Sequence, residues 1–182
     1  MNMKEQQKRP ALNEVMAYHN EHVIGSFMKS FDLPESETRD IFEQLKRMLW
    51  LGNEMEFDGL HDEGKAFSID RSLLILDEMW HTFILCTKDY QQFCMEIFGY
   101  YIHHNPQVES ETDKMTRHAE FSGLNEAQVI ARLADEKRWQ YAYVFKKLGK
   151  EIFIKWYTEF HHKYTPQRLL ELRQPKLPAA LP

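Results

Sequence analysis

Apolar residues recur every three or four positions along most of this chain, and few residues interrupt the pattern. The 182 residues include only seven glycines and seven prolines, and four of the prolines lie near the ends: Pro10, Pro175, Pro178 and Pro182. Spacings of three and four place apolar side chains on one face of an α-helix, and a helix interior tolerates proline poorly. No segment alternates as a strand does. The sequence therefore predicts an all-α fold.

The predicted elements follow from where the pattern starts and stops. We expect helices over residues 11–30, over about 35–56, over about 71–86 and from residue 87 to Gly99, then from about 124 to 148, from about 152 to 162 and over 166–173. The helix over about 71–86 is apolar on nearly all sides, which is typical of a helix at the centre of a core. We thus expect a compact single-domain bundle of five to seven helices over residues 11–174, between disordered ends at 1–10 and 175–182.

Composition and charge narrow the class of protein. Hydrophobic residues make up 43% of the chain and aromatic residues 13%, which is enough for a buried core. The net charge is −5 and the basic residues are scattered, so we expect no nucleic-acid partner. The first ten residues are polar, and no apolar run reaches the length of about 18 to 20 residues that a membrane span needs. We expect a cytoplasmic protein with no membrane partner.

Only two cysteines occur, and both lie in apolar surroundings. Cys86 follows Ile84 and Leu85, and Cys94 lies between Phe93 and Met95. Neither a disulfide framework nor paired CxxC motifs are present. We expect buried, reduced thiols that act as small apolar residues.

The segment 73–106 sets ionisable residues into an otherwise apolar, aromatic stretch. Those that bear on a site are Asp77, Glu78, His81, His103 and His104. Leaving a buried polar group without a partner costs about 1 to 3 kcal/mol, and a buried charge costs more. The partner of each could be another of these residues, a bound metal or a ligand.

One interpretation is a metal site. Asp77 and His81 are four residues apart, so they share one face of a helix. With His103, His104 or both from the following turn, they would make a set suited to Zn²⁺, or to Fe²⁺ bound by two histidines and one carboxylate. The alternative is structural: Asp77 accepts a hydrogen bond from His81 and ties the helix to the neighbouring turn.

The central segment also resembles a known family. The runs LDEMWHTFIL, DYQQFC and IFGYYIHHNP are similar to the glycine-rich domain-containing protein-like family of plants and bacteria, and the residues that carry the likeness are Asp77, Trp80, His81, Tyr90, Cys94, His103 and His104. The likeness covers roughly the central third of the chain and implies a fold without a defined reaction. The glycine-rich tail is absent, and Phe83 stands where the resemblance implies a second histidine, which removes one potential metal ligand.

Two functions fit these observations. The preferred one is a protein-interaction or adaptor module whose Asp/His motif stabilises the fold, with a protein partner or a small-molecule ligand. The alternative is a small metal-binding protein or metalloenzyme that uses Asp77, His81, His103 and His104, with residues 107–123 as a covering loop. No GxSxG, phosphate-loop, GxGxxG or kinase motif occurs, so whether a reaction is catalysed, and by which residues, stays open.

Overall fold

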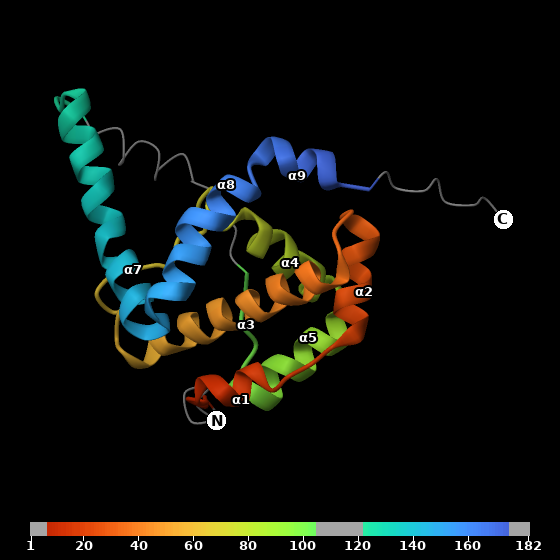
Figure 1. The fold of residues 1–182 in the computed structure, drawn as a ribbon. Coiled ribbons are helices and arrows are strands. Elements are labelled where there is room, and N and C mark those ends of the chain that lie inside the picture. Colours follow the sequence, from red (N-terminus) through yellow and green to blue (C-terminus); the bar gives the residue numbers. More distant parts are fainter. Residues whose placement is uncertain (1–6, 105–121, 175–182) are drawn as a thin grey trace.

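The computed structural model describes residues 7–104 and 122–174, and every regular element in them is a helix (Figure 1). The elements are α1 (Leu12–Met16), α2 (Glu21–Ser30), α3 (Glu35–Phe57), α4 (Leu74–Leu85), α5 (Thr87–Phe93), the π-helix η2 (Cys94–Phe98), α7 (Glu126–Ile154), the π-helix η3 (Lys155–Phe160), α8 (His161–Lys163) and α9 (Pro166–Leu172). The predicted all-α fold is confirmed. The disordered ends expected at 1–10 and 175–182 fall largely outside the described residues, and the single domain stays a prediction.

The long helix α3 crosses the middle of the molecule in Figure 1 and contacts α1, α2, α4 and α7. It contributes more buried residues than any other described helix. The apolar helix that we expected at the centre is α4, which packs against α2, α3 and α5. Because α4 buries its apolar face against α3, its polar side chains lie on the opposite face of the helix.

The single helix expected over residues 11–30 is wrong, since the chain forms α1 and α2 with a break between them. The side chain of Asn20 caps α2 by accepting a hydrogen bond from the backbone N–H of Val23 at 3.0 Å. The buried amine of Lys46 donates to the carbonyl oxygens of Met16 and Tyr18 at 2.8 and 2.6 Å. These two side chains satisfy the backbone groups that the break exposes.

A sharp turn at Gly149 folds the C-terminal part of the chain into two helical arms. Gly149 has φ 83° and ψ 176°, in a region that residues with a side chain rarely adopt. Figure 1 shows the first part of α7 running down to this turn and the chain rising again towards α8. Aromatic rings join the arms, as between Tyr141 and Tyr157, whose centroids are 4.5 Å apart. The predicted helix boundary near residue 148 corresponds to this turn.

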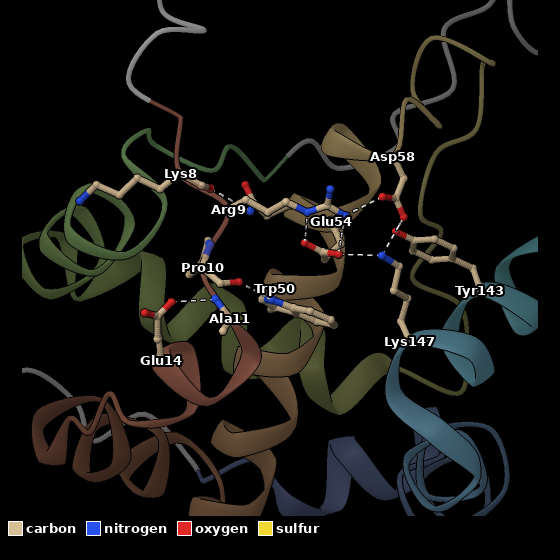
Figure 2. A network of polar contacts seen from close by, with 11 residues as sticks. Lys8, Arg9, Pro10, Ala11, Glu14, Trp50, Glu54, Asp58, Tyr143 and Lys147 are labelled. Atoms are coloured by element: carbon tan, nitrogen blue, oxygen red, sulfur yellow. Dashed lines mark hydrogen bonds and ion pairs between the residues drawn. The ribbon is translucent and has the colours of Figure 1, made fainter.

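Residues 7–10, in the segment where we expected disorder, contact α3 and the end of η2. Arg9 reaches the carboxylates of Glu54 and Asp58 at the end of α3, and Lys147 of α7 reaches the same two carboxylates (Figure 2). Trp50 donates to the carbonyl of Pro10 at 3.0 Å. The network joins three parts of the chain that are far apart in sequence.

The C-terminal helix α9 closes against the other end of the core. The backbone N–H of Asp32 donates to the carbonyl of Leu172 at 2.7 Å, and Phe31 and Arg173 form an isolated β-bridge. Leu169 and Leu172 are buried there. No helix in the described residues is both long enough and apolar enough to cross a membrane.

Candidate metal centre

Asp77 and His81 lie one turn apart on α4, on the side away from its buried residues. The nearest atoms of the pair are Asp77 Oδ2 and His81 Nδ1, 3.6 Å apart. This distance is longer than a hydrogen bond. The His81 side chain is half exposed, at 49%, so solvent reaches this side of the pair.

His104 comes to the same carboxylate from the segment that follows η2. Its Nε2 atom lies 2.9 Å from Asp77 Oδ1, at hydrogen-bond distance, and its side chain is only 12% exposed. Its ring packs edge-on against Trp80, with centroids 4.4 Å apart, and lies 4.6 Å from the ring of His81. Asp77 therefore lies beside two neighbouring imidazoles, with Oδ1 nearest to His104 and Oδ2 nearest to His81.

Two part-buried hydrogen bonds fix the segment that carries His104. The indole N–H of Trp80 donates to the hydroxyl of Tyr90 at 2.9 Å, and that hydroxyl donates to the carbonyl of Ile102 at 2.6 Å. Tyr90 is fully buried, and burial raises the pKa of its phenol. Because the hydroxyl stays protonated and donates, it holds the backbone two residues before His104.

The spacing of the three side chains is compatible with a shared ion. Asp77, His81 and His104 each offer one ligand atom, and these atoms lie within 4.8 Å of one another. Ligand atoms about 2.0 to 2.1 Å from a tetrahedral Zn²⁺ lie about 3.3 Å apart. His104 Nε2 lies 2.9 Å from Asp77 Oδ1 and His81 Nδ1 lies 3.6 Å from Asp77 Oδ2, so each histidine is nearest to a different carboxylate oxygen. Binding one ion through all three residues would require the side chains to close from the 4.8 Å limit to the spacing of about 3.3 Å.

Other residues of the central segment lie elsewhere. His103 is exposed, and its ring contacts that of Tyr101 at 4.9 Å rather than joining the three ligand atoms. Glu78 pairs with Arg173 at 2.5 Å and so helps to hold the end of α9. Of the two adjacent histidines, the structure thus brings only His104 to Asp77.

Position 83 faces the core. Phe83 is fully buried, and its ring contacts those of Phe42, Tyr90 and Phe93. It lies two residues beyond His81, which turns it to the other side of α4. A histidine at this position would therefore lie among aromatic rings and not beside Asp77, so Phe83 removes no ligand from this group.

The covering loop expected at residues 107–123 lies almost wholly outside the described residues. Cys94 is fully buried, and burial raises the pKa of its thiol, in keeping with a reduced, unreactive side chain. Cys86 is buried as well.

A second group of possible ligands was not predicted from the sequence. The ligand atoms of His22, Cys86 and Asp89 also lie within 4.8 Å of one another. Cys86 and Asp89 are three residues apart, which is a helical spacing, but His22 lies more than sixty residues away in sequence. No spacing rule connects residues so distant, so packing of α2 against the chain between α4 and α5 is needed to reveal the group.

These features define an all-helical protein with a candidate site of two histidines and one carboxylate on α4 and the segment after η2. Residues 30–135 match the UCP032817-like family model, which covers more than half of the chain, and the protein belongs to this family. The matched region includes Asp77, His81 and His104. The match does not confirm the name of the glycine-rich domain-containing family. Neither the curated proteins nor the solved structures gave a match.

Proposed function

We propose that this protein binds a divalent transition-metal ion, Zn²⁺ or Fe²⁺, through Asp77, His81 and His104. The observation that carries the proposal is that one carboxylate and two neighbouring imidazoles bring their ligand atoms within 4.8 Å of one another. His81 is too far from the carboxylate for a hydrogen bond, at 3.6 Å, but close enough to share an ion with it. The hydrogen bond at 2.9 Å between His104 and Asp77 already links α4 to the segment after η2, and a shared ion would add His81 to this pair.

The donor set limits the metal and what it could do. Two imidazole nitrogens and one carboxylate oxygen suit Zn²⁺, and they also suit Fe²⁺ with open positions. Three protein ligands leave room for water or a small-molecule ligand, on the side where His81 meets solvent. Trp80 and Tyr90 would act around the site by holding His104 in place.

The interaction or adaptor function that we preferred from the sequence is now the weaker proposal. The most exposed large apolar side chains in the described residues are Leu85, Leu170 and Phe145, at 80%, 66% and 50%. They belong to three different helices: α4, α9 and α7. Single exposed apolar residues are common on soluble proteins, so these do not favour a partner surface.

The test compares metal content in two histidine variants of tag-free, full-length protein. After removal of metal and reconstitution with Zn²⁺ or Fe²⁺, we expect His81→Ala to bind one ion per chain fewer than the unaltered protein. His103→Ala is the matched control, because His103 is an exposed histidine in the same segment that lies outside the three ligands. We expect it to keep the full metal content.

Two results would contradict the proposal. One is equal metal content in His81→Ala and in the unaltered protein. The other is a loss in His103→Ala as large as that in His81→Ala, which would point to surface histidines binding metal without a site. Because His81 is half exposed, its replacement leaves the core intact, and circular dichroism should confirm that both variants fold.

A further inference from the structure

Two helical junctions bring His22, Cys86 and Asp89 together. Cys86 ends α4 and precedes α5, and Asp89 lies in the first turn of α5. His22 lies in the first turn of α2. Since α2 packs against α4, and α4 against α5, the three side chains meet where these helices join.

Their geometry is that of a partly formed ligand set. His22 Nδ1 lies 2.8 Å from Asp89 Oδ2, and the Cys86 sulfur lies with these atoms within a 4.8 Å limit. Sulfur and nitrogen ligands of a tetrahedral zinc ion lie about 3.5 Å apart. The His22 side chain is 68% exposed, so it can rotate towards the sulfur without disturbing the core.

The neighbouring groups prepare the carboxylate for a cation. Asn20 donates to Asp89 Oδ1 at 3.0 Å, which leaves Oδ2 facing His22. The contact between His22 and Asp89 is exposed and contributes little to stability by itself, and the thiol of Cys86, which packs in the core, lies beside it.

We propose that His22, Cys86 and Asp89 form a second metal site, which contains a thiolate and takes a Zn²⁺-class ion. One sulfur, one nitrogen and one oxygen ligand favour zinc over magnesium or calcium, which prefer oxygen ligands alone. On binding, the S–H bond of Cys86 breaks, its proton passes to solvent, and the sulfur coordinates the ion. Water fills the fourth position. This site shares no residue with the one formed by Asp77, His81 and His104.

Cobalt(II) distinguishes the two sites, because only this one has a sulfur ligand. Metal-free, tag-free protein in a phosphine reductant should develop a near-ultraviolet thiolate-to-cobalt charge-transfer band that is complete once both proposed sites are filled, and excess Zn²⁺ should remove it. We expect Cys86→Ser to abolish the band, and His81→Ala to retain it. Cys94→Ser is the matched control: Cys94 is the other buried cysteine and belongs to neither group of ligands, so the band should remain.

His22→Ala provides a second variant in case Cys86→Ser does not fold. His22 is exposed, and its loss should weaken cobalt binding at this site by at least about tenfold while circular dichroism stays unchanged. The proposal is overturned if the unaltered protein gives no charge-transfer band, if the band survives in Cys86→Ser, or if His22→Ala binds cobalt with unchanged affinity. The two proposals can therefore fail separately. Absence of the charge-transfer band counts only against the site of His22, Cys86 and Asp89. Unchanged metal content in His81→Ala counts only against the site of Asp77, His81 and His104.

Discussion

Tyr90 shows how a single buried hydroxyl can position a candidate ligand. It accepts from Trp80 on α4 and donates to Ile102, two residues before His104. The same phenol thus connects the helix that carries Asp77 to the segment that carries His104. Its ring also packs against Phe83 in the core, so its position is fixed from both sides.

Replacing Tyr90 by phenylalanine should weaken both stability and metal binding. The change leaves the Trp80 N–H and the Ile102 carbonyl without this partner, so we expect a loss of about 1 to 3 kcal/mol in the free energy of unfolding. Metal affinity at the Asp77 site should fall by about 10- to 100-fold, as for other groups that orient a ligand. Urea unfolding and metal titration measure the two effects. Tyr101→Phe, at an exposed tyrosine in the same segment, is the control and should change neither.

Phe83 permits a test of the histidine that the family resemblance implied. Because the side chain is fully buried among aromatic rings, Phe83→His should lower the free energy of unfolding by at least about 2 kcal/mol. Metal stoichiometry should not rise, since position 83 faces away from Asp77. Chemical denaturation and metal analysis of the same preparation give both values. A gain in metal affinity would show that position 83 reaches the site.

Among the elements, the N-terminal segment and α7 are joined to α3 by charges. Arg9 and Lys147 approach Glu54 and Asp58 from two sides (Figure 2), and the side chain of Glu54 is only 8% exposed. A carboxylate this buried needs its cations. We therefore expect the network to stabilise the fold more than the exposed ion pairs of the surface do.

Arg9→Ala should lower the free energy of unfolding by about 1 to 2 kcal/mol, since Lys147 still pairs with Glu54 and Arg9 itself is partly exposed. Arg39→Ala is the matched control, because Arg39 also binds two carboxylates, those of Glu21 and Glu35, but all three groups are exposed. Arg39→Ala should lower the free energy of unfolding by much less than Arg9→Ala does. Equal losses in the two variants, measured by urea unfolding, would contradict the account.

The network should also make stability depend on acid pH. Arg9, above all, lowers the pKa of Glu54, and the hydrogen bond from Lys147 is the largest cause that lowers the pKa of Asp58 to about 2. A carboxyl whose pKa falls on folding stabilises the protein above its unfolded pKa, and this contribution is lost as the pH falls through the folded value. It should be complete above about pH 5 and decline towards pH 2.

The measurement is the free energy of unfolding between pH 6 and 2.5 for the unaltered protein and for an Arg9→Ala, Lys147→Ala double variant. We expect the difference in free energy of unfolding between the two proteins to narrow as the pH falls. Protonation of Glu54 and Asp58 removes the ion pairs through which Arg9 and Lys147 stabilise the fold. A difference that stays constant over this range would mean that these carboxyls do not titrate as the structure implies.

The helices could be predicted because their signals are local. Apolar spacing predicted α3 and α4, Pro166 marked the start of α9, and Gly99 and Gly149 end or turn helices with positive φ. The break between α1 and α2 was missed, because it depends on Lys46 reaching across from α3 as well as on the Asn20 cap. The π-helical turns of η2 and η3 likewise carry no signal in the spacing of apolar residues.

For the molecule as a whole, both described ends of the chain are held against the central helices. Arg9 fixes the N-terminal segment to α3, and the Arg173 pair with Glu78 fixes the end of α9 to α4. Asp77 and His81 lie on α4, the same helix as Glu78. The two ends of the described chain thus both contact the pair of helices, α3 and α4, on which the candidate site is built. Sites on rigid elements keep their ligands close to the required geometry.

The sequence indicated the candidate site in part. Helical spacing placed Asp77 beside His81, but it could not choose between His103 and His104, because neighbouring residues in an irregular segment point in different directions. The hydrogen bond from the Tyr90 hydroxyl to the carbonyl of Ile102 fixes the backbone of this segment, with His104 rather than His103 beside Asp77. The group of His22, Cys86 and Asp89 could not be predicted, since its members meet only through the packing of α2, α4 and α5.

The central claim is that Asp77, His81 and His104 bind one metal ion together, and X-ray absorption at the zinc edge tests it most directly. The sample is the Cys86→Ser variant loaded with one Zn²⁺ per chain, so that the thiolate of the second proposed site is removed. We predict scattering from two imidazole rings and from oxygen ligands, with one imidazole lost when His81→Ala is added. A spectrum of oxygen ligands alone, or one that His81→Ala leaves unchanged, would contradict the claim.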